Sequence, residues 1–242
     1  MEHEDPRARK PYSRLQSAVM MSDLRQRVLE TVREDICTSR LAPGERLDEH
    51  QVSARTGVSR GVVHQAVREL SEQGWLTTTD GGCVVRVPSP EEAAEIDEVR
   101  RALEEVIVRC FVARASDSQL QALHRRLIEF EELAELPPDP AALLWAKDNF
   151  FSLLLRAAGL MTTLEALVKL RARIVVLLCV SLCMPGRARA VAAELHELYD
   201  ALADRDAERA VRACSTHLER SYHAGFEALN AMGVPLPDER RP

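Results

Sequence analysis

Apolar residues recur every four positions in the first part of the chain, following a serine. This spacing places them on one face of a helix, which we predict over residues 22–38 with Ser22 as its N-cap. The shared apolar face consists of Leu24, Val28, Val32 and Ile36. The Leu-Ala-Pro-Gly segment at residues 41–44 then ends the helix, because proline and glycine both interrupt helical backbone.

Two shorter helices are predicted next, at residues 48–55 and 59–72. Thr56 and Gly57 interrupt the pattern between them, and Ser59 is the candidate N-cap of the second helix. Two short helices joined by a glycine-containing turn make a helix-turn-helix, which places its second helix in the major groove of DNA. We therefore predict that this part of the chain binds DNA.

Two β-rich runs follow, at residues 75–79 and 83–87, on either side of an Asp-Gly pair. An Asp-Gly pair between such runs is the strongest short-range signal for a β-hairpin. We expect this hairpin to be the wing of a winged helix-turn-helix. Pro88, Ser89 and Pro90 form a linker, because proline removes a backbone donor and disfavours helix just before it.

Helical periodicity continues from residue 91 almost to the end of the chain. It predicts six helices and no strand, at residues 91–115, 117–136, 141–158, 162–183, 187–204 and 206–230. The predicted fold class is therefore mainly α, an N-terminal winged helix-turn-helix followed by an all-α bundle. Its parts are a flexible basic arm (1–21), the DNA-binding domain (22–87), a linker (88–90), a dimerisation and effector-binding domain (91–232) and a tail (233–242).

Composition favours a globular protein, since 46% of the 242 residues are hydrophobic and 29% are charged. No run approaches the roughly 18 consecutive apolar residues of a membrane helix. The N-terminus also lacks the apolar stretch of a secretory signal. We therefore expect a cytoplasmic protein, located at the nucleoid when bound to DNA, with no membrane partner.

The cysteines are scattered along the chain: Cys37, Cys83, Cys110, Cys179, Cys183 and Cys214. They form no Cys-x-x-Cys pair, and no histidine lies at zinc-finger spacing, so we expect reduced and mostly buried thiols. Cys179 and Cys183 lie one helical turn apart. That spacing serves either core packing or a redox pair.

The net charge of −6 arises entirely from the second part of the chain. Residues 1–87 contain 13 Lys or Arg and 13 Asp or Glu, whereas the remainder contains 19 and 25. A neutral front domain binds DNA if its positive charges gather on one face. The predicted arm also has Arg7, Arg9, Lys10 and Arg14, which suit a phosphate backbone.

Residues 41–87 resemble the GntR family of bacterial regulators. The similarity rests on LAPGERL at 41–47, TGVSRGVVHQAVREL at 56–70, QGWL at 73–76 and the glycine-tipped wing. It implies DNA contacts from His50, Ser59, Arg60, Gly61, His64, Gly81 and Gly82. Within this set Ser59 is also expected to cap the recognition helix with its side chain, and the two wing glycines either approach the minor groove or simply form a tight turn.

Two positions of the predicted recognition helix depart from the family pattern. Gly61 and Val62 occupy the places where Thr-Pro is usual, and His64 replaces an Arg that commonly contacts DNA. A neutral histidine contacts a base less strongly than a bidentate arginine does. The preferred operator is therefore expected to differ from those of typical members.

The helical region resembles the FCD effector domain, from IDEVRRALE at 96–104 to DAERAVRACSTHL at 206–218. Many members hold a divalent metal there with an Asp and a His from one helix and a His from each of two later helices. Alignment on FFSLLLRAAG at 150–159 places Lys147 at the Asp position and Phe151 at the first His position. His217 alone remains in register, so we expect that the metal site is lost and that no cofactor binds.

A shifted metal site is the alternative to this expectation. Leu195 occupies the third ligand position and His196 follows it, about 100° further round the helix. Asp148 is likewise adjacent to an expected ligand. A slip in register would combine Asp148, His196 and His217.

Family effectors are mostly carboxylates or other acidic metabolites, which the resemblance extends to this chain. Lys147 supplies a positive charge in place of the metal, and Arg100 matches a family arginine that faces the pocket and clamps a carboxylate. The predicted effector-binding residues are Arg100, Lys147, Phe151, His196 and His217. The alternative is that the two cations are solvated and that Phe151 is an ordinary core residue.

Three functions are compatible with this pattern. The first is a homodimeric regulator, usually a repressor, that binds an inverted-repeat operator in double-stranded DNA and responds to a small acidic molecule. The second is a constitutive DNA-binding regulator with a ligand-free pocket. An enzyme on the helical bundle is disfavoured, because the sequence has no Gly-x-Ser-x-Gly, phosphate-binding loop or His-Glu-x-x-His motif.

Overall fold

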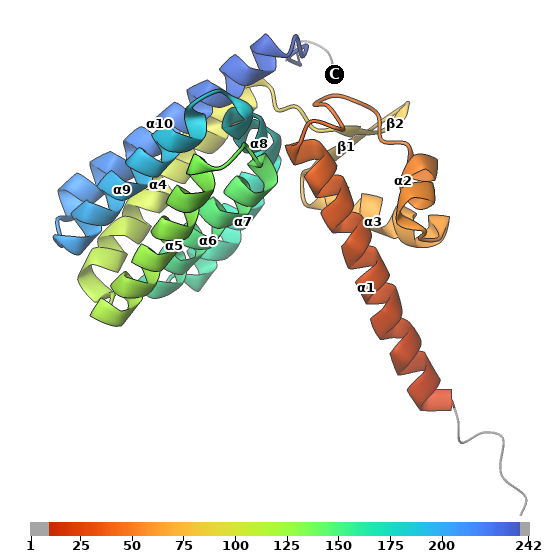
Figure 1. Ribbon diagram of the computed structural model, residues 1–242, viewed down its shortest axis with the longest axis horizontal. Helices are drawn as coiled ribbons and strands as arrows, with labels where there is room; N and C mark the ends of the chain where they lie inside the picture. The colour runs from red at the N-terminus through yellow and green to blue at the C-terminus, as the bar shows by residue number, and fades with distance from the viewer. Residues whose placement is uncertain (1–9, 238–242) are drawn as a thin grey trace, which may run out of the picture.

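The computed structural model describes residues 10–237, which form two helical regions joined by a short linker (Figure 1). The first region contains α1 (Lys10–Cys37), α2 (Glu49–Thr56), α3 (Arg60–Glu72), β1 (Leu76–Thr79) and β2 (Gly82–Val85). The second contains α4 (Pro90–Arg114), α5 (Asp117–Glu135), α6 (Pro140–Ala158), α7 (Met161–Arg173), α8 (Val175–Cys183), α9 (Arg187–Ala203) and α10 (Ala207–Ala231). The predicted mainly α fold class is confirmed.

The first region is a winged helix-turn-helix in which α1 packs across α2 and α3. The Asp48 carboxylate accepts hydrogen bonds from the amides of His50 and Gln51, at 2.8 and 3.3 Å, and so caps α2. Gly57 ends α2 in a left-handed conformation with φ of +68°. The buried core between these helices includes Val28, Val32, Ile36, Val63 and Leu70.

The wing is an antiparallel hairpin, as predicted. Leu76 pairs with Val85 and Thr79 pairs with Gly82, so Asp80 and Gly81 form its two-residue turn. Arg46 adds an isolated bridge to Val84 and thereby attaches the segment before α2 to the outer edge of the wing. With the hydrogen bond from the Leu47 amide to the Cys83 carbonyl at 2.9 Å, this pairing holds the segment before α2 against β2.

The first helix is longer than the sequence pattern predicted. It begins at Lys10 rather than Ser22, so residues 10–21 are helical, whereas we expected them in a flexible arm. The segment contains no glycine, and its single proline, Pro11, lies in the first turn, where a missing amide proton breaks no helical hydrogen bond. Figure 1 shows this end of α1 projecting away from the rest of the molecule. Arg7 and Arg9 lie outside the described residues.

The second region is a bundle in which α10 packs against α4, α8 and α9 (Figure 1). Gly225 permits a close approach of α10 to α8, because a Cβ atom there would lie 3.0 Å from the carbonyl oxygen of Leu177. By length and composition, no single helix within residues 10–237 qualifies as a membrane span; α8 and α9 pass that test only as a pair bent by 113°.

The helix predicted over residues 162–183 is two helices. The backbone of Ile174, with φ of −116° and ψ of 12°, separates α7 from α8. Ile174, Val175 and Val176 are a run of β-branched residues, which weakens the helical preference at this point. The break lets α8 enter the core, where all but its last residue are buried, while α7 stays largely at the surface.

Polar and steric contacts join the two regions. Glu92 at the start of α4 accepts a hydrogen bond from Arg86 at 2.6 Å and pairs with Arg173 of α7 at 2.5 Å. Gly74, which precedes β1, has φ of +82°, and a Cβ atom there would lie 2.9 Å from the carbonyl oxygen of Ala172. Glycine is therefore required at this junction between the wing and α7.

Candidate DNA-binding face and buried charge cluster

One face of α3 is exposed along its whole length. The opposite face is buried in the domain core and consists of Val62, Val63, Ala66, Val67 and Leu70. The exposed residues are Arg60, Gly61, His64, Gln65 and Arg68. A helix that is buried on one side and presents polar side chains on the other has the form needed to enter a major groove.

Ser59 occupies the N-cap position of α3, but the described chain shows no capping hydrogen bond from its side chain. The prediction of a side-chain cap is therefore wrong. With φ of −60° and ψ of 147°, the extended Ser59 backbone starts the helix without that bond. Its exposed hydroxyl group and the first amides of α3 remain available for a phosphate, which the positive end of a helix attracts.

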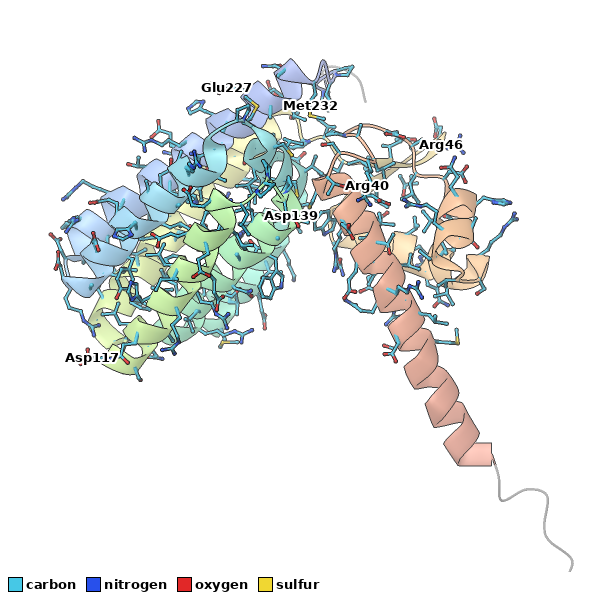
Figure 2. All side chains as sticks on the ribbon, in the orientation of Figure 1. Arg40, Arg46, Asp117, Asp139, Glu227 and Met232 are labelled. Atoms are coloured by element: carbon cyan, nitrogen blue, oxygen red, sulfur yellow. The ribbon has the colours of Figure 1, made fainter. Side chains whose placement is uncertain are left out.

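A groove of about 640 Å³ lies between the wing and the beginnings of α2 and α3. His50, Arg60 and Gly82 line it, so three of the predicted DNA-binding residues come together there with Arg46. A Cβ atom on Gly82 would lie 3.2 Å from Nε of Arg46, and the missing side chain gives that guanidinium its place. Figure 2 labels Arg46 beside α2 and the wing. Two guanidinium groups on one groove suit a nucleic-acid backbone.

The remaining predicted residues surround this groove. Nδ1 of His64 lies 3.2 Å from the Glu49 carboxylate, so a side chain of α2 holds its ring. At Gly61 an added Cβ atom would meet nothing within 4 Å, and packing does not explain this glycine. In the wing, Gly82 takes a left-handed conformation with φ of +116°, whereas Gly81 does not. The tight turn accounts for Gly82.

The second region buries a cluster of charged side chains. Arg100 of α4, Lys147 of α6 and His217 of α10 are 5%, 2% and 2% exposed, and Phe151 of α6 is buried with them. The rings of Phe151 and His217 stack with centroids 5.6 Å apart. Four of the five predicted effector residues are therefore inside the bundle, and the alternative that the two cations are solvated is wrong.

Lys147 is the one cation of this cluster that has no hydrogen bond or ion pair with any described residue. Burial and the nearby guanidinium groups of Arg171, Arg100 and Arg187 together lower the pKa of its ammonium to about 8, against the opposing charge of Asp148. Because that pKa still lies above neutrality, an unpaired positive charge is held inside the protein at pH 7.

Glu194 of α9 neutralises the other side of the cluster. It accepts two hydrogen bonds from Arg187, at 2.7 and 3.0 Å, and one from Nδ1 of His217 at 2.7 Å. Burial would raise the pKa of Glu194, but these donors outweigh burial and lower it to about 2. Burial, together with the charges of Lys147 and Arg187, lowers the pKa of His217 to about 4 against the effect of Glu194, so its ring is neutral at pH 7. Because a carboxylate only accepts, the ring proton lies on Nδ1.

His196 is not part of this cluster. Its ring is half exposed on α9, where Nδ1 lies 2.7 Å from Glu131 and Nε2 lies 3.8 Å from Asp200. The prediction of His196 as an effector residue placed it on the wrong face of the helix, because Leu195 takes the inward position and is fully buried.

The cluster does not have the donors of a divalent metal site. Lys147 and Phe151 offer neither a carboxylate nor an imidazole, and Asp148 pairs with Arg171 instead. Within residues 10–237, no three His, Cys, Asp or Glu side chains are arranged to hold a metal ion. The shifted combination of Asp148, His196 and His217 therefore does not assemble.

Several residues of both sites were not predicted from the sequence. On α3, Gln65 and Arg68 follow Gly61 and His64 at helical spacing, and that spacing alone would have placed them on the exposed face. In the bundle, Arg187 and Glu194 are seven residues apart and so share a face of α9. Arg46 lies within the LAPGERL segment, but no local pattern places it against the wing.

Two sequence families match the chain. The one described as "Bacterial regulatory proteins, gntR family" matches residues 24–85, and the FCD domain matches residues 95–220, which is more than half of the chain. The two matches coincide with the winged helix-turn-helix and with most of the helical bundle.

Individual relatives agree with these matches. The Nta operon transcriptional regulator of Aminobacter aminovorans is 35% identical over 95 residues, 39% of this chain and 45% of that protein. The HTH-type transcriptional repressor RspR of Escherichia coli K12 is 25% identical over 195 residues, 80% of this chain and 85% of that protein. A solved GntR regulator from Rhodococcus sp. RHA1 is 28% identical with a TM-score of 0.65, over 86% of this chain and 98% of that one. The matches span about half the length of the first two curated relatives.

The fold, the exposed recognition helix and these relatives define a DNA-binding transcriptional regulator. The chain belongs to the GntR family of bacterial regulators and carries an FCD domain. Since the relatives are regulators, the prediction that the chain is not an enzyme is confirmed.

Proposed function

We propose that this regulator responds to a small carboxylate that binds beside Lys147 in the bundle. The observation that carries the proposal is the unpaired ammonium of Lys147, which is 2% exposed. A buried charge without a partner is strongly unfavourable. A bound anion would supply the missing partner.

The neighbouring arginines favour the same class of ligand. Arg100 donates to Glu104 at 3.2 Å through Nη2, and Arg187 is paired with Glu194, yet the buried Nε of each has no hydrogen-bond partner among the described residues. Unsatisfied buried donors are rare in folded proteins. A carboxylate oxygen accepts hydrogen bonds from ammonium and guanidinium groups alike.

Helix α7 connects this cluster with the DNA-binding domain. Arg171 pairs with Asp148, and its guanidinium carbon lies 5.7 Å from the centre of the Phe151 ring. The next residue, Ala172, contacts Gly74, and Arg173 pairs with Glu92. We propose that an anion beside Lys147 attracts the guanidinium group of Arg171 and so moves α7. This displacement would reorient the DNA-binding domain.

We further propose a homodimer that represses transcription at an inverted-repeat operator. On α4, Val99 and Val106 are 43% and 49% exposed, and Ala102 between them is also exposed. Spacings of three and four residues place all three on one face, which suits a helix from a second copy. A two-fold dimer presents two equivalent recognition helices. The name of RspR as a repressor supports the same role here.

The test is a thermal shift of the full-length protein against mono-, di- and tricarboxylates and inorganic phosphate. A ligand at about one hundred times its Kd adds about 2.7 kcal/mol and raises the Tm by roughly 5–10 °C. Lys147→Met should abolish the shift, whereas Lys169→Met, which removes an exposed lysine of α7, should preserve it. The same ligand should release DNA from the wild type and from Lys169→Met, but not from Lys147→Met.

Two outcomes would contradict the proposal. A shift that survives in Lys147→Met would place the ligand elsewhere. No shift with any acid would favour a constitutive regulator.

We also propose that the cluster binds no divalent metal, because His217 is its only family ligand in place. Elemental analysis of the same samples should find no stoichiometric zinc, nickel or manganese. About one ion per chain would overturn this.

A further inference from the structure

Three cysteines from the two domains meet at the end of α1. Cys37 is the last residue of α1, whereas Cys179 and Cys183 lie on α8 of the bundle. The sulfur atoms of Cys37 and Cys179 are 2.7 Å apart. Sγ of Cys183 lies 3.7 Å from the Cys37 carbonyl oxygen, on the same junction.

The geometry selects one pair among the three. A disulfide bond is about 2.05 Å long, so the sulfur atoms of Cys37 and Cys179 need to move by less than about 1 Å to bond. Cys179 and Cys183 are four residues apart on one helix, where Cβ atoms are about 5–6 Å apart, beyond the 3.5–4.5 Å of a disulfide. The favourable bond therefore joins α1 to α8.

The three thiols also differ in access. Cys37 and Cys179 are 3% and 0% exposed, while Cys183 is exposed. Burial raises the pKa of the Cys179 thiol well above its ordinary value and raises that of Cys183 as well, which keeps both protonated at rest. Cys183 is the thiol that a dissolved oxidant meets first.

We propose that this cluster is an oxidation site at which a hydroperoxide produces a Cys37–Cys179 disulfide between the DNA-binding domain and the bundle. Cys183 is the entry point of the oxidant. The proposal does not depend on the carboxylate ligand, because it concerns other residues and a covalent product. It gives a function to the Cys179 and Cys183 spacing, which serves packing alone in the reduced protein.

The reaction balances over three steps. The Cys183 thiol loses its proton, its sulfur attacks the hydroperoxide and the O–O bond breaks. The proton joins the leaving oxygen, which departs as an alcohol or water, and a sulfenic acid forms at Cys183. The Cys37 thiol then attacks that sulfur and expels water. Finally the Cys179 thiol attacks Cys37 and regenerates the Cys183 thiol, so two thiols and one hydroperoxide become one disulfide, one alcohol and one water.

The consequence is a fixed junction between the two domains. The bond would join positions 142 residues apart and would hold the end of α1 against α8. A link across so long a segment restricts the unfolded chain and the relative motion of the domains. Oxidised protein should therefore melt at a higher temperature, and a thiol reductant should reverse the change.

The test treats full-length protein with hydrogen peroxide and maps disulfides by mass spectrometry without reduction. Trypsin releases Cys37 in residues 34–40 and the other two cysteines together in residues 174–187. We expect these two peptides linked, with fragmentation across Val180 to Leu182 assigning the bond to Cys179. Cys183→Ala should form the same bond at least fivefold more slowly, Cys37→Ala should not form it, and Cys110→Ala should match the wild type.

Other products would overturn the proposal. Peptides that stay unlinked, a final bond from Cys37 to Cys183, or bonds only between different chains would each show that the sulfur atoms of Cys37 and Cys179 do not form the oxidation site. A Cys183→Ala rate equal to that of the wild type would remove Cys183 as the entry point. Mapping the bond in the wild type keeps the test valid even if a variant fails to fold.

Discussion

His217 shows at the residue scale how burial sets the chemistry of the bundle. The family resemblance identified it as the one metal ligand still in register, and the structure buries it between Phe151 and Glu194. Its proton lies on Nδ1 toward Glu194, and Lys147 adds a repelling charge. His217 therefore acts as a neutral donor that positions Glu194 and, through it, Arg187.

The lowered pKa of His217 predicts that acid destabilises the bundle. Since the folded pKa is about 4 and the ordinary value is about 6.5, the unfolded chain binds more protons between these limits. Stability should fall as the pH drops from 6.5 to 4, by an amount on the order of 3 kcal/mol. Urea unfolding at several pH values measures this loss.

His217→Gln is the matched control, because the Gln amide still donates to Glu194 and does not titrate. Its stability should change less than that of the wild type across the same pH window. Equal slopes for the two proteins would show that His217 does not titrate as a buried neutral group.

The charge cluster was predicted from sequence only in part, for reasons visible in single residues. Arg100, Lys147, Phe151 and His217 were found through alignment with family motifs. His196 was misplaced because one position along a helix rotates a side chain by about 100°. Glu194 was not predicted because its hydrogen bond with His217 joins α9 to α10, and a contact between two helices leaves no local pattern in the sequence.

At the scale of elements, hydrophobic periodicity predicted type and order better than ends. The wing and the helix pair before it follow from Gly57 and from the Asp-Gly turn, which are local signals. The extension of α1 to Lys10 was not predicted, because it precedes the apolar face, Leu24 to Ile36, on which the predicted helix was based. The break at Ile174 depends on α8 entering the core, and a tertiary constraint of that kind is not contained in the segment itself.

Gly74 tests whether α7 and the wing are joined by close packing. Gly74→Ala places a Cβ atom 2.9 Å from the Ala172 carbonyl oxygen and also strains a left-handed backbone. We expect a loss of more than about 1 kcal/mol and a weaker effect of ligand on DNA binding. Urea unfolding and DNA titration measure the two effects.

Gly57→Ala separates the two causes. Gly57 is also left-handed, with φ of +68°, but an added Cβ atom there meets nothing within 4 Å. It should show only the backbone strain of about 1 kcal/mol. If the two variants are equally stable and equally responsive to ligand, the contact between Gly74 and α7 does not couple the domains.

At the scale of the whole molecule, the two domains carry different sites. The winged helix-turn-helix presents α3 and the groove beside Arg46, while the bundle encloses the charge cluster and α7 links the two. The acidic surplus of the chain lies beyond residue 87. The DNA-binding domain is therefore free of the net negative charge that would repel a phosphate backbone.

The placement of α3 on DNA is tested most directly by the affinity of the full-length protein for operator DNA recovered from its own cells. Fluorescence anisotropy measures this affinity over a range of salt concentrations. Arg60→Ala should weaken binding by roughly 5–150-fold, equivalent to about 1–3 kcal/mol, and should reduce the salt dependence. Arg212→Ala, which removes an exposed arginine of α10, should bind like the wild type. The recovered sites should contain an inverted repeat. Unchanged affinity in Arg60→Ala would contradict the placement of α3 and its groove on DNA.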